Sequence, residues 1–317
     1  MNANKAGDTS PPPLSHVHGC VLISTTLVAT SFTVGKAIAP TLDPAVLVLL
    51  RFCVAVVLFA PLIIYQYKVC LPSLQDLGRY SIISCALVGF FYLMFTALRY
   101  TSALNTGVIF TLVPGLSSIF AAILVKERLG KYRLASLLPA TLGALWIIFA
   151  GDMEKALALE MNKGDVIFFA GCLCMALYTP LVKLFHRGEP MAIMTFWVLA
   201  TSCGWLLLLS GFTIAEVDWT TVGLKTWLGI IYLAIFTTII TFSISQWATL
   251  HIGPTRVIAY SFLYPLLIVL IEWSLGHELP SLKTLSGIVL IVPAMFIIQR
   301  GAEKQSIKPQ AYPKETQ

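Results

Sequence analysis

The chain has 317 residues, of which 57% are hydrophobic and only 11% are charged. Soluble domains carry about 25% charged residues, so this composition excludes an ordinary soluble enzyme, a disordered chain and a coiled coil. The net charge of +6 comes from Lys and Arg in short segments between apolar runs. That distribution indicates membrane topology rather than nucleic-acid binding, so the composition predicts a polytopic membrane protein with no nucleic-acid partner.

Ten apolar runs follow one another along the chain, and most have the length that crosses a bilayer as a helix, about 20 residues. The polar residues before the first run and after the last are expected to form disordered cytoplasmic tails. The runs are too long for membrane β-strands and lack their strict alternation. We therefore expect an all-α membrane protein with spans at residues 20–38, 44–64, 80–98, 104–125, 134–150, 166–182, 191–210, 226–247, 257–275 and 284–299.

An internal repeat organises these runs. A shift of 151 residues places the third to fifth runs on the eighth to tenth without a gap, and it matches Pro114 with Pro265 and Glu127 with Glu278. Five spans per half is an odd number, so the second half must enter the membrane from the opposite side. The chain thus divides into a tail, two inverted halves of five helices and a second tail: residues 1–18, 19–150, 164–299 and 300–317.

Inverted repeats are typical of secondary transporters, whose substrate site lies between the halves near the bilayer midplane. A channel or a membrane enzyme can also contain repeats, so both stay open as alternatives of another class. The seven cysteines and five histidines include no CxxC pair, no cluster with zinc-site spacing and no HExxH motif. We expect neither a metal nor a cofactor, and no enzymatic activity.

The distribution of Lys and Arg predicts the orientation. With the amino terminus inside, fourteen Lys and Arg lie in the cytoplasmic tails and loops and six lie outside. This excess favours cytoplasmic termini, and the cluster from Lys126 to Arg133 is its strongest anchor. Lys36 and Lys183 occupy equivalent places near the ends of the first and sixth spans, and they are read as gating, anion-recognition or interfacial lysines.

The prolines in the fourth and ninth spans and the sequence KERLG at 126–130 resemble the EamA type of the drug/metabolite transporter superfamily. The resemblance covers residues 20–299. It implies export of amino acids or related small metabolites across the bacterial inner membrane. The expected mechanism is alternating access, and proton antiport, exchange of a counter-substrate and facilitated diffusion all stay open as the driving force. Other branches of the superfamily imply an alternative, an exchanger of nucleotide-linked or S-adenosylmethionine-type metabolites.

Two prolines and two charges stand out within the predicted spans. Pro114 and Pro265 lack an N–H and release the carbonyl four residues earlier, so they are expected to kink cavity-lining helices and act as hinges. Arg51 and Glu272 lie at similar depths from the outer surface. They are expected to form an ion pair, or Glu272 carries a proton, or its carboxylate reaches the outer surface.

Polar and aromatic residues near the predicted midplane complete the candidate substrate cavity. By the resemblance, the first, third, fourth, sixth, eighth and ninth helices line it. Any single hydroxyl there can instead be satisfied within its own helix. The candidates for contact with a small-molecule substrate are Ser31, Thr33, Tyr92, Thr111, Tyr178, Thr238, Ser243, Tyr260 and Tyr264.

Overall fold

The computed structural model describes residues 13–67, 71–126, 131–149, 152 and 162–306. All regular secondary structure in these ranges is helical. Most of the predicted tails, most of the loop between the halves and residues 127–130 of the KERLG segment lie outside the described residues. The first half contains α1 (Leu14–Ile38), α2 (Pro44–Tyr67), α3 (Leu74–Ala97), α4 (Ala103–Phe110), α5 (Val113–Leu124) and α6 (Lys131–Ile148).

The second half begins with α8 (Lys163–Phe185), α9 (Met191–Ser210) and the short α10 (Thr213–Glu216). One long helix follows in three parts, of which the middle one is a π-helix. The next helix also has three parts, joined by a turn of 3₁₀-helix. In chain order these elements are α11 (Leu224–Ala234), η1 (Ile235–Ile240), α12 (Thr241–Ile252), α13 (Pro254–Ala259), η2 (Tyr260–Leu263), α14 (Tyr264–Ser274) and finally α15 (Leu282–Ser306).

Eight helical segments are long and apolar enough to cross a membrane. They coincide with eight of the ten predicted spans. The other two predicted spans lie in α6 and α15, whose apolar stretches are shorter, Leu138–Ile148 and Leu282–Ile291. The chain is therefore an integral, multi-pass, all-helical membrane protein.

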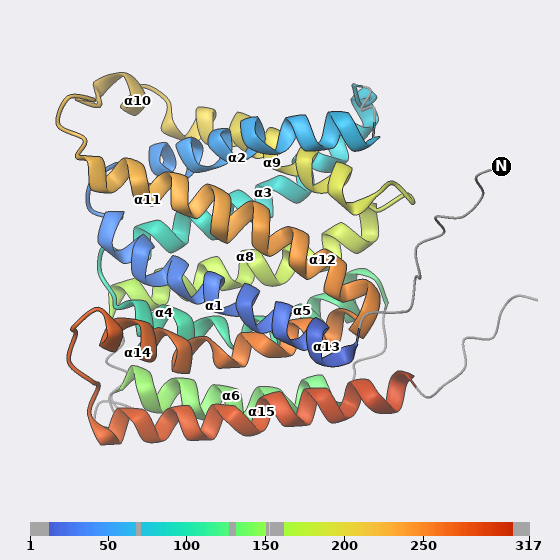
Figure 1. Cartoon of the computed structure of the whole chain (residues 1–317), viewed down its shortest axis with the longest axis vertical. Coiled ribbons are helices and arrows are strands. Elements are labelled where there is room, and N and C mark those ends of the chain that lie inside the picture. Colours follow the sequence, from blue (N-terminus) through green and yellow to red (C-terminus); the bar gives the residue numbers. More distant parts are fainter. Residues whose placement is uncertain (1–12, 68–70, 127–130, 150–151, 153–161, 307–317) are drawn as a thin grey trace, which may run out of the picture.

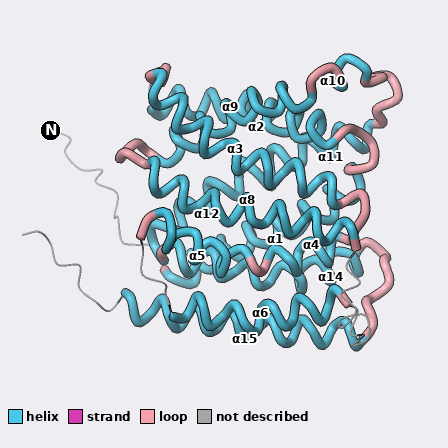
Figure 2. Tube along the Cα trace, turned by 180° about the vertical axis from the view of Figure 1, so that it is seen from behind, coloured by secondary structure: helices cyan, strands magenta, loops and turns pink. Residues whose placement is uncertain are grey.

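The helices lie side by side in one bundle (Figure 1). α2 packs on α9 at one edge and α6 packs on α15 at the other, while α1, α3, α8 and α12 lie between them. The same two edge pairs are seen from behind in Figure 2. We call the end where α1 begins and α15 ends the terminal end, and the opposite end the distal end.

The first and last helices extend further than the sequence predicts. The sequence predicts tails at residues 14–18 and 300–306, but in the structure these residues belong to α1 and α15. Val17 explains the first extension, because it is fully buried with Val21 against Ala248, Ile252 and Tyr260. Burial of that apolar contact extends the helix past the polar residues around it.

The fourth and ninth predicted spans, which contain Pro114 and Pro265, are interrupted rather than merely kinked. Thr111 and Leu112 separate α4 from α5, and their N–H groups donate to the carbonyls of Val108 and Ile109 at 3.0 and 3.1 Å. Pro114 then lies in the first turn of α5, and Pro265 has the same place in α14 after η2. A proline fits the first turn, because N–H groups there need no intrahelical partner.

Close contact of α6 with α15 depends on two glycines, Gly143 and Gly287. A Cβ at Gly143 would lie 2.7 Å from the Gly287 carbonyl oxygen. We expect Gly143→Val to force the helices apart and to destabilise the protein by about 1–3 kcal/mol through overpacking. The measurement is the midpoint of thermal unfolding in detergent.

Gly204→Val on α9 is the matched control, because nothing lies within 4 Å of a Cβ built there. Both variants carry the same cost of a β-branched residue in a helix. Equal shifts of the two unfolding midpoints would contradict the close α6–α15 contact.

Candidate functional site

A cavity of about 970 Å³ occupies the terminal half of the bundle. Its wall is formed by the two interrupted helices together with α1, α2, α8, α9 and α12. The wall includes Gln66 and Tyr67 at the end of α2 and Pro254 at the start of α13, so the cavity reaches the terminal end. All its described lining residues are uncharged. The aromatic ones are Phe59, Tyr67, Phe110, Tyr178, Phe242, Trp247 and Tyr264.

Five aromatic rings close the cavity towards the distal end. Phe110 and Tyr264 line the cavity and lie 5.5 Å apart between ring centroids. Behind them, Phe32 lies 6.0 Å from Phe110 and 6.2 Å from Phe168, and Phe90 contacts both Phe110 and Phe168. Edge-on and tilted contacts of this kind are favourable beyond the area they bury. We call these five residues the aromatic plug.

Beyond the plug, hydrogen bonds tie the helix connections together at the distal end. Lys36 Nζ donates to the Leu98 carbonyl at 2.8 Å. Arg99 donates through Nε to the Ala39 carbonyl at 3.0 Å and through Nη2 to the Leu42 carbonyl at 2.6 Å. The Leu98 and Ala39 carbonyls lie at the C-terminal ends of α3 and α1, where a positive charge is stabilising. Lys36 is therefore a contact between α1 and the α3–α4 turn.

A buried carboxylate strengthens the same end. Asp165, in the first turn of α8, is 1% exposed and accepts hydrogen bonds from Thr101 Oγ1 and Asn105 Nδ2. Gly164 permits this approach, because a Cβ there would lie 2.8 Å from Thr101. Asp165 also lies where the helix dipole favours a negative charge. We call Lys36, Arg99 and Asp165, with their partners, the distal latch.

Arg51 is an intramembrane charge, as the sequence predicts, but its partner is not Glu272. Arg51 is 2% exposed. Its guanidinium donates to Thr238 Oγ1 from Nε (3.2 Å) and Nη2 (3.0 Å), and to Thr237 Oγ1 at 3.1 Å. It also lies 4.5 Å from the centre of the Phe91 ring. The expected Arg51–Glu272 ion pair is wrong, because similar depth did not place the two side chains on facing helices.

The Arg51 contacts coincide with the π-helix η1. Thr238 Oγ1 donates to the carbonyl of Leu233, five residues earlier, at 3.0 Å. A π-turn carries an extra residue and is frequent at functional sites. Here it places the hydroxyls of Thr237 and Thr238 together in front of one guanidinium. Arg51 Nη1 has no hydrogen-bond partner among the described residues.

Three of the nine predicted cavity residues line the cavity: Tyr178, Ser243 and Tyr264. The structure does not bring the other six together with them. The hydroxyls of Ser31 and Thr111 donate to carbonyls of their own helices, and Thr33 Oγ1 is buried with no hydrogen-bond partner in the part of the chain that the structure describes. Tyr92 lies outside the cavity lining. Thr238 serves Arg51, and Tyr260 hydrogen-bonds His18 Nδ1 at 2.7 Å.

Several residues that line the cavity are not among the nine predicted from the sequence. Ser261 lines it, is 4% exposed and has no hydrogen-bond partner among the described residues. Its position four residues before Pro265 was the available signal. Gln246 Nε2 donates to Thr195 Oγ1 at 2.8 Å across the wall from α12 to α9. Pro114 and Pro265 are the second residues of α5 and α14, and the first residues of these segments, Val113 and Tyr264, line the cavity.

Comparisons with known proteins agree with this architecture. The sequence profile described as the EamA-like transporter family matches residues 18–149 and again 162–300. The chain is 27% identical to the uncharacterized transporter YyaM of Bacillus subtilis (strain 168) over 205 residues, which cover 64% of this chain and 67% of that protein. The uncharacterized transporter YetK of the same organism is 23% identical over 298 residues, covering 90% and 86%.

A solved structure titled only as the crystal structure of a protein shares the fold. Its TM-score is 0.65 at 18% sequence identity, and the match covers 92% of this chain and 99% of the other.

Loss of one hydroxyl tests the Arg51 contact. We expect Thr238→Val to destabilise the protein by about 1–3 kcal/mol, because it removes an acceptor from a buried charged donor. The measurement is thermal unfolding in detergent. Ser243→Ala is the control, because that hydroxyl is exposed and bonds the carbonyl of its own helix at Ile239.

In an Arg51→Met background the cost of Thr238→Val should largely disappear, since the two sites are coupled. A cost that stays unchanged in that background would contradict the contact.

Proposed function

The chain belongs to the EamA-like transporter family, and we propose that it is a secondary transporter that moves a small metabolite by alternating access. One observation carries the proposal. The cavity of about 970 Å³ reaches the terminal end, while the aromatic plug and the distal latch close the other end. A channel needs a path through both ends, so this closed arrangement favours a carrier over a channel.

The two halves form an inverted repeat of five helices each in this proposal. The starts of α4, α5 and α6 are followed 151 residues later by the starts of α13, α14 and α15. The end of α1 and the start of α2 are followed 147 residues later by the end of α8 and the start of α9. The family profile also matches twice, once in each half.

Packing partners exchange under the same correspondence. The counterpart of α1 is α8, that of α3 is α12 and that of α5 is α14. α3 and α5 both pack on α8, and their counterparts α12 and α14 both pack on α1. α2 packs on its own counterpart α9, and α6 on α15. Such exchange is expected of a pseudo-twofold axis through the bundle, with α6 and α15 counted as the fifth and tenth spans. It supports an arrangement in which the halves rock around one site.

Positions that are equivalent under the repeat are in close contact at the distal end but line the open cavity at the terminal end. At the distal end, a Cβ on Gly35 would lie 3.0 Å from Leu98 Cδ1, so α1 touches the α3–α4 turn. The equivalent positions at the terminal end are Val182 and Thr249, and both line the cavity. The structure thus supports a state open at one end and closed at the other. We propose that the open end faces the cytoplasm of a bacterial cell across its inner membrane.

The residues that are equivalent to the aromatic plug under the internal repeat have smaller side chains. The residues equivalent to Phe168, Phe32, Tyr264 and Phe110 all line the cavity; they are Val21, Thr179, Val113 and Ser261. Four of the five rings of the aromatic plug therefore stand where the terminal end has smaller side chains. This difference favours the observed state in the absence of substrate.

The cavity chemistry favours an amino acid or a related compound of no net charge. Tyr178, Ser261 and Tyr264 offer hydroxyls to the cavity from α8, η2 and α14, and aromatic rings provide apolar surface. Nucleotide-linked metabolites carry phosphates, which proteins bind with Arg and Lys. No Arg or Lys is among the described lining residues, so the superfamily's nucleotide-linked branch is the weaker candidate.

Counterflow in proteoliposomes tests the proposal. Vesicles preloaded with pooled unlabelled amino acids should transiently accumulate a trace labelled amino acid, because one saturable site exchanges the two. We expect Tyr178→Phe to raise the half-saturating concentration about fivefold, as loss of one hydrogen bond of about 1 kcal/mol predicts. Tyr92→Phe, outside the cavity lining, should leave it unchanged.

Each outcome separates parts of the proposal. Exchange of a nucleotide-linked pool alone would contradict the amino-acid assignment and keep the transporter. Absence of counterflow for both pools would contradict the transporter. Uptake driven by a pH gradient alone would assign a proton as the coupling partner, and Glu272→Gln then tests whether Glu272 carries it.

A further inference from the structure

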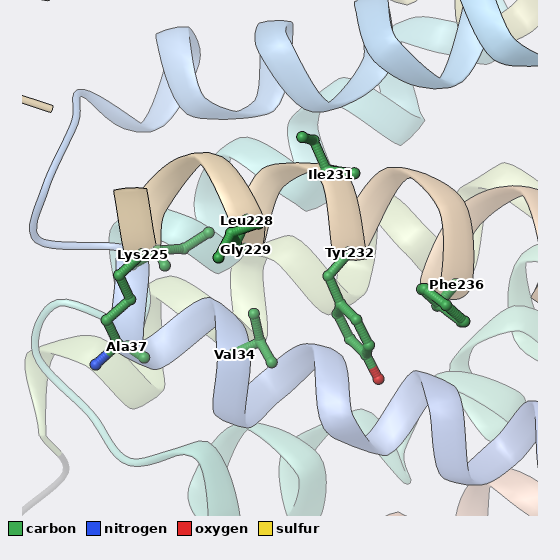
Figure 3. A pocket seen from close by; sticks show the side chains of 9 residues that line it. Val34, Ala37, Lys225, Leu228, Gly229, Ile231, Tyr232 and Phe236 are labelled. Atoms are coloured by element: carbon green, nitrogen blue, oxygen red, sulfur yellow. The ribbon is translucent and has the colours of Figure 1, made fainter. Parts of the chain in front are cut away.

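A second cavity, of about 490 Å³, is a groove between α1 and α11 at the distal half of the bundle (Figure 3). Val34, Ala37 and Ile38 form one wall. The other wall comes from α11 and η1, and in Figure 3 it extends from Lys225 at one end to Phe236 at the other. Lys225 is the only charged residue among its described lining residues.

The floor of the groove is tightly packed, and the one hydroxyl among its described lining residues, that of Tyr232, is already hydrogen-bonded. Gly229 lets the helices approach, because a Cβ there would lie 2.9 Å from Ile38 Cγ2. Tyr232 Oη and Thr30 Oγ1 are 2.7 Å apart and form a hydrogen bond that ties α11 to α1. The Tyr232 ring stacks on Phe236 at 5.0 Å. The groove therefore presents carbon surface along its length.

The groove matches one leaflet of a bilayer in length and position. Lys225 and Phe236 are eleven residues apart on one helix, which corresponds to about 16 Å at 1.5 Å per residue. One leaflet contributes about 15 Å of hydrocarbon. Trp219 and Trp227 stack at 6.1 Å beside the Lys225 end, and paired Trp residues are enriched at the membrane–water interface. Lys225 thus lies at the level of the lipid headgroups.

We propose that this groove binds one phospholipid with an anionic headgroup. An acyl chain lies along the groove from Lys225 towards Phe236, and the exposed Lys225 ammonium contacts the phosphate. The apolar walls account for the chain, and the single cation at the headgroup level accounts for the charge preference. This site requires only that the protein spans a membrane, so it does not depend on which solute the central cavity carries.

Photo-crosslinking in nanodiscs tests the site. The probe is phosphatidylglycerol with a diazirine in its acyl chain, at trace level in phosphatidylcholine, and crosslinked peptides are mapped by mass spectrometry. We expect crosslinks to concentrate on residues 34–38 and 225–236. Lys225→Ala should reduce them about fivefold, the effect of one lysine near an anionic lipid surface. Lys283→Ala, which removes another exposed cation at the distal end, should not.

A second variant fills the groove without touching the charge. Ala37→Phe places a ring where the acyl chain would lie and should abolish the concentrated crosslinks, whereas Ala170→Phe on the exposed face of α8 should preserve them. Crosslinks spread evenly over all exposed apolar faces, or unchanged in both Lys225→Ala and Ala37→Phe, would overturn the proposal. Equal crosslinking by a phosphatidylcholine probe would overturn the preference for an anionic headgroup.

Discussion

The two interrupted helices are the constraint on which the rest of the structure depends. A membrane offers no water to a released backbone group, so a break in a spanning helix must face protein or a cavity. The breaks before Pro114 and Pro265 both lie beside the central cavity, since Val113 and Tyr264 line it. They also place Phe110 and Tyr264 side by side at its closed end. The cavity and its plug thus follow from the two prolines.

Polar contacts hold the closed end where the apolar packing stops. Lys36 and Arg99 bond carbonyls at helix ends, and Asp165 accepts hydrogen bonds from the α3–α4 turn. Each of these side chains makes hydrogen bonds that lipid could not provide. Arg51 is buried deeper, and its two threonine partners belong to the π-helix. An irregular helix and an intramembrane charge therefore support each other, which is why neither is expected to tolerate loss of the other.

Depth along the chain was predictable from the sequence, but direction around each helix was not. Apolar runs predicted most of the spans, and the two prolines marked where the helices depart from a regular α-helix, although as kinks rather than breaks. Among the predicted polar residues, Ser31 and Thr111 donate to their own helices, while Tyr178 lines the cavity. The Arg51–Glu272 pair failed for the same reason. The π-helix has no simple sequence signal, and the extension of α1 depends on the packing of Val17.

The most direct test of alternating access is crosslinking of V182C with T249C in a variant without the native cysteines. These positions line the open end, and their counterparts, Gly35 and Leu98, touch at the closed end. If the halves exchange states, an exchanging substrate should promote the disulfide between the two introduced cysteines, and the oxidised protein should stop transporting until it is reduced. Transport that continues with the terminal end locked shut would contradict the account.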